Sequence, residues 1–477
     1  MKSKKLENNY YDKLTCLNDV IFNISSVSYK LRQPTYVIGG YVRDLLIGRD
    51  SKDIDIVTLG SGIELAKEVG KDLKTKKVSI FKNFGTAMIK KDEYELQFVG
   101  ARKESYNKHS RNPVVENGTL DDDQKRRDFT INALAISLNK ENKGILIDPF
   151  NGLSDLENKI IKTPLNPDLT FSDDPLRMMR AIRFSAQLNF EIEEKTFNGI
   201  IKNVERIKIV AQERITEELN KIILSSYPSK GFKLLDKSGL LKIIFPEFDN
   251  LKGVEFIDGN GHKDNFYHTL QVLENILPHS KNNLWLRWAA ILHDIAKPHT
   301  KRYSPKHGWT FHGHEDKGAR MVPQLFKKLK LPLDDKMRYV QKLVLLHLRP
   351  IALTNEKITD SALRRLLFDA SDNLEDLLKL CKSDITSKNK EKVSRYLKRF
   401  EIVGKKLKEV EERDRIKNWQ PPIDGKEIME KYNLKPCKEI GLLKEAIKNA
   451  ILDGKIENNY DEAKRFMEST AIKMGIK

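Results

Sequence analysis

The sequence predicts an α+β protein: a small mixed-sheet head with helices, followed by an all-α remainder. Between residues 35 and 150, short runs rich in β-branched residues alternate with helical runs. After residue 150 the apolar residues recur with the period of helices. The histidines then concentrate between His262 and His347.

Bulk composition narrows the class of protein. A length of 477 residues suggests several domains. The net charge of +18 suits a nucleic-acid partner, and equally a lysine-rich solvated surface. Three scattered cysteines without a CxxC pair predict a reducing, cytoplasmic location. The sequence shows no signal-peptide pattern and no run near the roughly 20 apolar residues of a membrane span, so we expect no membrane partner. It does not indicate any particular protein partner.

Each element follows from its local pattern. In the head we expect strands at "TYVIGG" and "DIDIVTL", helices at "VRDLLIG" and "GIELAKEVGKDL", and a hairpin at "TAMIKKDEYELQFVG". Further helices are expected at 173–188, 211–224 and 229–244, and a charged helix near 400 is stopped by two prolines. The expected divisions are a helical lead-in at 1–30, the head at 31–150, a helical neck at 151–250, the histidine-rich domain at 251–400 and a helical tail at 401–477.

The segment "DIDI" places two carboxylates on one face of a strand. Residues two apart face the same side, so Asp53 and Asp55 lie together and the isoleucines oppose them. Mg²⁺ prefers such oxygens and completes its shell with water and phosphate. Two ions about 3.5–4 Å apart would activate a hydroxyl and stabilise pyrophosphate. A solvated strand edge is the alternative. Glu95 is a candidate third carboxylate or a surface residue.

The glycines before this strand favour a phosphate site. Gly39 and Gly40 let backbone N–H groups approach an anion, and a helix follows them. Arg43 is placed to pair with phosphate oxygens. A plain tight turn is the alternative, and the pattern is not a Walker A loop.

These motifs resemble the tRNA nucleotidyltransferase / bacterial poly(A) polymerase family. After "GGYVRDLLIG" and "DID" come "KRRDFTINAL", "DPFNGLSDL", "DDPLRMMRAIRF" and "ERITEEL", in the family's order over some 180 residues. The resemblance implies that Asp53 and Asp55 bind Mg²⁺, while Glu95 matches less directly because "ELQFVGARKESY" departs from the shorter family pattern. It implies nucleotide contacts at Gly40, Arg43, Arg127, Asp174, Arg177, Arg180 and Arg183, with Gly39 beside them.

Asp174 and Arg177 are the candidates for choosing the base. The plain interpretation is an aspartate N-cap before a proline. The functional interpretation is that Asp174 and Arg177, which are three residues apart, lie on the same face of a helix and read the base together. A carboxylate accepts from the amino group of cytosine or adenine, and a guanidinium donates to the ring nitrogen. Guanine and uracil would leave buried groups unpaired, at about 1–3 kcal/mol per group.

The neighbouring charges complete this expected site. Arg177, Arg180 and Arg183 form a basic stripe that would face a triphosphate, or else a solvated surface. We expect Arg127 to contact the nucleotide and Asp128 to lock an arginine or a neck residue. Arg214 and Glu218, spaced four apart, are expected to pair and to brace the neck.

A second constellation lies in the histidine-rich region. His268, the adjacent pair His293–Asp294, and Asp384 offer imidazole and carboxylate ligands. This order is similar to the H…HD…D pattern of the HD phosphohydrolase superfamily, which implies a divalent metal (Mg, Mn, Ni or Fe) and action on phosphates. His314 and His347 stand where additional ligands occur, whereas His312 is expected to be a bystander.

The combined expectation is a Mg²⁺-dependent enzyme that adds C, C and A to tRNA 3′ ends from CTP and ATP and releases pyrophosphate. Segment 102–124 is expected to be a loop long enough to rearrange between C and A addition. Three alternatives stay open: a poly(A) polymerase or partial CC- or A-adding enzyme, an HD phosphohydrolase with a nucleotide-sensing head, and a non-catalytic RNA-binding protein. The tail resembles that of fused enzymes, with Cys437 in place of a commoner glycine, or simply caps the HD domain.

Overall fold

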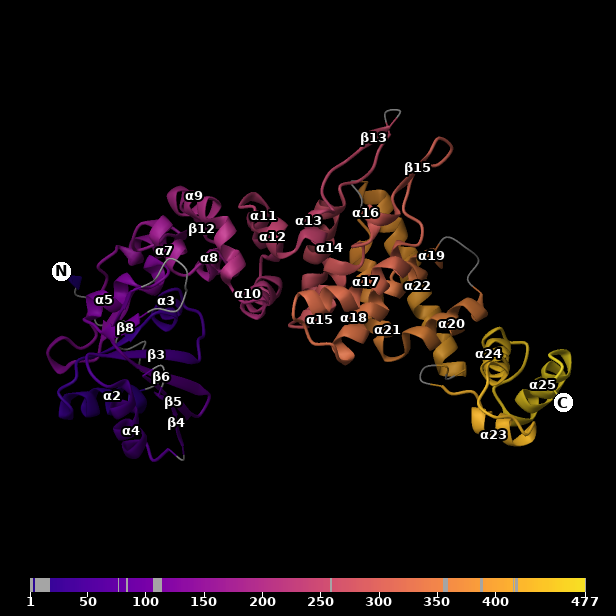
Figure 1. Ribbon diagram of the computed structural model, residues 1–477, viewed down its shortest axis with the longest axis horizontal. Coiled ribbons are helices and arrows are strands. Elements are labelled where there is room, and N and C mark those ends of the chain that lie inside the picture. Colours follow the sequence, from indigo (N-terminus) through magenta and orange to yellow (C-terminus); the bar gives the residue numbers. More distant parts are fainter. Residues whose placement is uncertain are drawn as a thin grey trace. The chain divides into compact units, whose positions relative to one another are not determined.

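The computed structural model describes residues 3–4, 18–75, 77–82, 85–105, 114–257, 260–354, 359–386, 389–414, 416 and 419–476. The chain forms two compact units, Met1–Pro246 and Glu247–Lys477 (Figure 1). The first contains a mixed sheet and helices, and the second is helical in its described part apart from short hairpins. This confirms the predicted fold class. The finer divisions inside each unit stay predictions.

Among the described residues, the head sheet has eight strands in the order β1-β10-β9-β2-β3-β6-β5-β4. β3 and β6 run parallel, and the other neighbouring strands are antiparallel. The bounds are β1 Ser3–Lys4, β2 Thr35–Ile38, β3 Asp53–Thr58, β4 Val78–Phe81, β5 Thr86–Lys91, β6 Tyr94–Gly100, β9 Ala135–Ser137 and β10 Leu146–Ile147.

One face of the sheet is covered by helices. α4 (Gly62–Asp72) packs on β3, β5 and β6, with α2 (Asn18–Lys30) beside it (Figure 1). The side chain of Ser61 caps α4 by accepting from the Glu64 N–H. Ile54 and Ile56 are fully buried, as the alternation along β3 predicts.

The opposite face carries the aspartates at one end and an apolar cluster farther along. The cluster consists of Tyr36, Ile38, Val57, Ala101, Leu120 and Ala135. Because Leu120 opens α5 (Leu120–Lys125), this helix packs on the cluster. At the start of β3, Asp53 is exposed and Asp55 is partly buried.

Two head segments differ from expectation. The segment 102–124 is not a plain loop: β7 (Arg102–Ser105) pairs with β8 (Val114–Asn117), and α5 follows behind a Thr119–Asp122 capping box. The β-branched Val114 and Val115 favour that ribbon, and its tip, 106–113, lies outside the described residues. In the expected helical lead-in, Ser3–Lys4 instead forms β1, whereas α2 is helical; 5–17 are not described.

The neck is helical, and its helices are interrupted at Asp174 and Pro175, inside the motif "DDPLRMMRAIRF". α7 (Pro167–Asp173) ends before Asp174, and α8 (Leu176–Leu188) begins after Pro175. Asp174 is extended (φ −132°, ψ 98°) because a residue before proline avoids the helical region. The following helices are α9 Glu194–Asn203, α10 Gln212–Leu224, α11 Pro228–Lys237 and α12 Leu240–Ile244.

The second unit is built from helices whose ends converge. Its principal helices are α14 Asn265–Ser280, α15 Leu284–Leu292, α17 His314–Lys328, α18 Asp335–Leu346, α20 Asp360–Ala370, α21 Leu374–Asp384 and α22 Lys390–Asp414. The tail helices are α23 Gly425–Lys431, α24 Lys438–Leu452 and α25 Tyr460–Lys473, which share their own apolar core. No helix in the described residues has the length and hydropathy needed to cross a membrane.

Two hairpins in this unit were missed by the sequence analysis. β13 (Phe256–Ile257) pairs with β14 (Asn260–Gly261), and β15 (Arg302–Ser304) pairs with β16 (Gly308–Thr310). Their strands have two or three residues, which is too short for an alternating pattern to stand out.

Candidate functional site

The turn after β2 brings a glycine against charged side chains. Gly39 has φ +87°, and a Cβ there would lie 2.7 Å from an Arg127 guanidinium nitrogen and 3.2 Å from Asp55 Oδ2. A side chain would be strained and would displace Arg127. Gly40 opens α3 (Gly40–Leu46), and its Cβ would meet only Arg43, at 3.7 Å. The close approach thus requires glycine at position 39.

The parallel register brings the third carboxylate to the same face. Asp53 is paired with Glu95 across β3 and β6, and Asp55 with Gln97. Asp53 is exposed and Asp55 is partly buried. Glu95 forms an ion pair with Lys90 at 3.3 Å. Three carboxylates therefore share one open face, with oxygen donors of the kind that Mg²⁺ prefers.

Asp55 and Arg127 are electrically coupled. Burial raises the pKa of the Asp55 carboxyl, and the positive charge of Arg127 offsets this only in part. Arg127 is held by Asp123, whose Oδ2 accepts from its Nε at 3.2 Å. A cation bound near Asp55 would favour its charged form.

Asp123 is the residue that the sequence analysis missed. Its carboxylate is fully buried and binds both Arg126 and Arg127. In the run "DDDQKRRD" it is one of several neighbouring charged residues. The signal that could have identified it is its spacing of three and four residues from the two arginines on a short helix.

Arg43 is buried and already bonded. Its guanidinium donates to both carboxylate oxygens of Asp44, each at 2.9 Å, and to Asn132 Oδ1 at 2.7 Å. It also lies over the ring of Phe184, 4.8 Å from the centroid. Arg180 and Arg183 face the same ring at 5.5 and 3.9 Å. Phe184 thus gathers three guanidinium groups from the head and the neck.

Asp128 binds a residue of the neck, which was one of the two alternatives expected from the sequence. Its Oδ2 accepts from Arg180 at 2.6 Å, and its Oδ1 from Asn132 at 3.0 Å. Burial would raise the pKa of Asp128, but Arg180, Asn132 and Arg177 outweigh it and lower the pKa to about 2. Arg177 adds a second tie by donating to the Arg126 carbonyl at 2.7 Å.

The brace inside the neck differs from expectation. The buried carboxylate of Glu218 accepts from Arg183 Nε at 2.6 Å and from Lys221 at 3.2 Å. Arg214 points to the exposed side of α10, so the predicted Arg214–Glu218 pair is wrong. Arg183 also donates to Gln187 at 2.9 Å. Its nucleotide-binding role stays a prediction.

The two candidate base-reading residues do not share one continuous helix. Asp174 lies in the break between α7 and α8, where its Oδ1 accepts from the Leu176 N–H at 3.2 Å. This is the expected capping contact, although the helix starts one residue later than predicted. Arg177 follows in the first turn. Both residues are partly exposed, so the break leaves each side chain accessible to a ligand.

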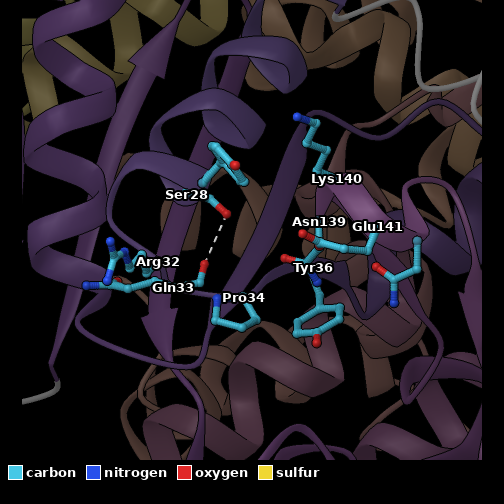
Figure 2. A pocket seen from close by; sticks show the side chains of 10 residues that line it. Ser28, Arg32, Gln33, Pro34, Tyr36, Asn139, Lys140 and Glu141 are labelled. Carbon is cyan, nitrogen blue, oxygen red and sulfur yellow. Dashed lines mark hydrogen bonds between the residues drawn. The ribbon is translucent and has the colours of Figure 1, made fainter.

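A hollow of about 380 Å³ in the head lies away from these groups (Figure 2). It is lined by Arg32, Gln33, Tyr36, Asn139 and Lys140, among others. It opens at the Thr35 end of β2, whereas Gly39 follows the other end. It brings together none of the predicted site residues.

In the second unit, six predicted ligands converge at helix ends. His268 lies in the first turn of α14, His293 and Asp294 follow α15, His314 begins α17, His347 follows α18, and Asp384 ends α21. Two groups of three have ligand atoms within 4.8 Å of one another: His268, His293 and Asp294, and then Asp294, His314 and His347. Asp294 belongs to both groups. His312 is exposed, as expected of a bystander.

The imidazole Nε2 atoms face the two carboxylates. His268 Nε2 lies 2.9 Å from Asp384 Oδ1, and His293 Nε2 lies 3.2 Å from Asp294 Oδ2. His314 Nε2 lies 3.2 Å from the other oxygen of Asp294, and His347 Nε2 lies 4.0 Å from it. The described structure gives the buried His293 Nε2 no hydrogen-bond partner.

Backbone contacts fix three of these rings. His293, His314 and His347 each place Nδ1 within 2.6–2.8 Å of the carbonyl three residues earlier. A carbonyl only accepts, so Nδ1 carries the proton and Nε2 is left as the ligand atom. Outer bonds of this kind are typical of metal-binding histidines. The arrangement therefore fits a divalent transition metal, for which imidazole is a suitable ligand.

The cluster is strongly coupled electrostatically. Burial acts to lower the pKa of His293, but Asp294 and Asp384 outweigh it and raise it to about 10. Burial, with the nearby His293, lowers the pKa of His347 to about 4. Lys297 approaches Asp294 Oδ2 at 2.6 Å. The two buried carboxylates thus favour nearby positive charge, which Lys297 supplies in part and which a protonated imidazole or a metal ion would add to.

Three stretches of the chain match known families. Residues 35–162 match the Poly A polymerase head domain. Residues 189–252 match the family described as a probable RNA and SrmB-binding site of polymerase A. Residues 265–377 match the HD domain.

Curated relatives divide between two names. An A-adding tRNA nucleotidyltransferase of Deinococcus radiodurans is 31% identical over 74% of this chain and 80% of that protein. A multifunctional CCA protein of Nitrosococcus oceani is 34% identical over 62% of this chain and 70% of that protein. An A-adding enzyme of Aquifex aeolicus is 39% identical, but the match spans 42% of this chain and only 24% of that protein.

Solved structures show the same fold. A Thermotoga maritima CCA-adding enzyme complexed with tRNA has a TM-score of 0.60 at 23% identity and covers 96% of each chain. A CCA-adding enzyme complexed with ATP has a TM-score of 0.65 at 22% identity and covers 99% of this chain and all of the other.

Proposed function

The chain belongs to the tRNA nucleotidyltransferase family, and from this premise we propose that it adds C, C and A to the 3′ end of tRNA, using CTP and ATP. The observation that carries the proposal is the open carboxylate face of Asp53, Asp55 and Glu95, next to Gly39 and Arg127. The relatives that cover most of their own length support it.

Asp53 and Asp55 would hold Mg²⁺, with Glu95 as a third oxygen donor. When bound, the ion would lower the pKa of the terminal 3′ hydroxyl and stabilise the leaving pyrophosphate. The 3′ oxygen forms a bond to the α-phosphorus, the bond to the β-phosphate oxygen breaks, and the hydroxyl proton leaves. Arg127, beside Gly39, is positioned to bind the phosphates.

Asp174 and Arg177 would select the base. Asp174 would accept from the exocyclic amino group of cytosine or adenine, and Arg177 would donate to the ring nitrogen. Both side chains are accessible at the break between α7 and α8. Guanine and uracil present the reverse order of donor and acceptor and would leave groups unpaired, at about 1–3 kcal/mol per group.

A narrower activity, addition of the terminal A alone, is the second candidate. It is favoured by one observation: two of the three relatives described above carry the A-adding name. The same carboxylates and arginines would serve either activity, so the two candidates differ in how the base site accommodates cytosine.

The test offers the purified protein a tRNA transcript that ends at the discriminator base, with Mg²⁺ and labelled CTP, ATP or both. Addition of two cytidines and one adenosine, lost in Asp53→Ala, is the expected result. Addition of adenosine to a CC end alone would assign the A-adding activity, and a long A tract would assign poly(A) synthesis. No incorporation on any end would overturn the proposal.

We also propose that the second unit is a metal-dependent phosphohydrolase. Its six ligands suit two divalent ions that share Asp294, because Asp294 belongs to both ligand groups. Four imidazoles favour Fe or Ni over Mg²⁺, with Mn as an intermediate case. Bound metal would supply a water of lowered pKa for attack on phosphorus.

Metal analysis and hydrolysis test this second activity. Two metal equivalents per chain are expected, and loss of both in Asp294→Asn. Hydrolysis of p-nitrophenyl phosphate should follow metal content. Retained metal in that variant, or a loaded protein without hydrolysis, would count against it.

A further inference from the structure

Asp123 is a buried carboxylate held between two arginines of the head. Its side chain lies in α5 and has no exposed surface. An ionised group in such a place is costly unless cations and hydrogen bonds compensate it. Here each oxygen has its own arginine: Oδ1 accepts from Arg126 Nε at 2.9 Å, and Oδ2 accepts from Arg127 Nε at 3.2 Å. Both oxygens are therefore committed to holding guanidinium groups.

The helix that carries Asp123 is itself fixed to the sheet. The next residue, Gln124, is fully buried, and its side-chain amide donates to the carbonyl of Ala133 at 2.6 Å and to that of Ile147 at 3.2 Å. Ile147 lies in β10, and Ala133 lies just before β9. A capping box closes the first turn of the same helix. The carboxylate of Asp123 thus has a defined position relative to the sheet.

The first of the two arginines reaches the carboxylate face of β3. A Cβ on Gly39 would lie 2.7 Å from Arg127 Nη1 and 3.2 Å from Asp55 Oδ2, so this guanidinium stands beside the catalytic candidates. Its second partner among the described residues is the carbonyl of Asn132, at 3.4 Å. Because a guanidinium has five N–H donors, these two bonds leave others for phosphate oxygens. The bond to Asp123 therefore orients Arg127 without occupying it.

The second arginine holds a candidate base-reading residue through its backbone. Arg126 is the C-cap of α5, and its carbonyl accepts from Arg177 Nη2 at 2.7 Å. Arg177 lies in the first turn of α8, and the described residues give it this one hydrogen bond, so its other N–H donors can meet a base. Because the Arg126 side chain is tied to Asp123, the carbonyl that orients Arg177 is held as well.

We infer that Asp123 is a positioning residue for nucleotide addition: its carboxylate fixes the arginine that faces the phosphates and, through Arg126, the arginine that faces the base. This rests on the nucleotidyl transfer proposed above and adds a residue on which both the rate and the choice of base depend. Asp123 itself touches neither substrate nor metal ion, because it is fully buried and both of its oxygens are bonded.

The first experiment replaces Asp123 with an amide of the same size. In Asp123→Asn one oxygen becomes an NH₂ group, which only donates, so one arginine loses its partner. At saturating tRNA and Mg²⁺, kcat for addition of CMP should fall about tenfold to a hundredfold, while KM for CTP rises by no more than about threefold, since the arginines remain and only their orientation is lost. Asp121→Asn is the matched control and should change neither, because Asp121 lies on the same helix, is 43% exposed and pairs with Lys125.

Base choice supplies a readout that a merely structural role would not move. The preference for CTP over UTP, and for ATP over GTP, measured as a ratio of kcat/KM values, should fall about threefold to tenfold in Asp123→Asn. Added to Arg177→Ala, the change should lower this preference no further, and added to Arg127→Ala it should lower kcat no further, since Asp123 acts through these arginines. Full additional losses in both double variants would assign Asp123 a general structural role and overturn the inference.

A second variant covers the case in which Asp123→Asn does not fold, which thermal unfolding would reveal. Arg126→Ala leaves Asp123 paired with Arg127, so it should lower the base preference by a larger factor than kcat; the reverse order would overturn the inference. Equilibrium binding separates the inference from the proposed function. If the wild type incorporates nothing, that function fails, and CTP should still bind more tightly than UTP to the wild type but not to Asp123→Asn. Equal preference in the two proteins, or none in the wild type, would overturn the role of Asp123.

Discussion

The head and the histidine cluster both gather carboxylates, but they hold them in different ways. In the head, Asp53 is exposed and Glu95 is paired with a lysine, while the nearby arginines are bonded to Asp123, Asn132 and Asp128. In the second unit, Asp294 and four imidazoles are buried and face one another within about 4 Å.

This difference indicates which interactions stabilise the fold around each site. In the head the arginines are bonded to protein groups, Asp53 is exposed and Asp55 is only partly buried, so we expect the fold not to depend on a bound ion. The cluster buries carboxylates and imidazoles together, so we expect its fold to depend on a bound cation. An open site suits a large, changing substrate, and a closed one suits a fixed metal. Four predictions would break or sharpen this contrast.

The largest effect is expected from Asp53→Ala. If Asp53 holds the proposed metal ion, its loss removes several kcal/mol of transition-state stabilisation, so nucleotide incorporation should fall by about 10³-fold or more. Because Asp53 is exposed, thermal unfolding of the protein should not change. Single-turnover incorporation and calorimetry measure the two. A large loss of stability would show that the head carboxylates are structural after all.

Removal of bound metal should affect the unfolding of the two units differently. Chelation is expected to lower the unfolding temperature of the second unit alone, since a ligand at a hundred times its Kd stabilises a fold by about 2.7 kcal/mol. Differential scanning calorimetry with and without chelator checks this. In Asp294→Asn the shift should vanish. A matching shift in the transition of the first unit would contradict the contrast.

Arg180→Ala tests the head–neck lock. Breaking a fully buried pair costs about 3–5 kcal/mol, but the Arg180 side chain is 35% exposed, so about 2 kcal/mol is expected at pH 7. The pKa of Asp128 is lowered to about 2, so this stabilisation is present above about pH 4 and lost as pH falls towards 2. Denaturant unfolding of both proteins at pH 7 and at acid pH measures it. A difference that persists at pH 2 would disprove the ion-pair origin.

The smallest effect concerns the glycine pair. Gly39→Ala should cost about 1–2 kcal/mol, because φ is +87°, and should lower nucleotide incorporation by displacing Arg127. Gly40→Ala is the matched control: its Cβ would make an ordinary contact at 3.7 Å, so stability and activity should be nearly unchanged. Equal tolerance at both positions would show that Arg127 moves aside freely.

Patterns with strong periodicity were predictable from sequence, and contacts between distant segments were not. The alternation in "DIDI" gave the orientation of Asp53 and Asp55 and the burial of the isoleucines. Pro175 broke the helix that the 3.6-residue period extended through Asp174. Glu218 was assigned to Arg214 by spacing, but burial placed it with Arg183 on another helix. The two hairpins of the second unit have strands of two and three residues, below the length at which an alternating pattern is visible.

The ring of Phe184 contacts arginines of both the head and the neck, so its surroundings depend on how the two are oriented. Its ring lies 4.8 Å from the Arg43 guanidinium of the head and 3.9 Å from that of Arg183 in the neck. Any rotation of α8 against the sheet must slide one cation off the ring while another stays. A fluorine label on this phenylalanine would therefore report such a rotation as a change in its resonance frequency.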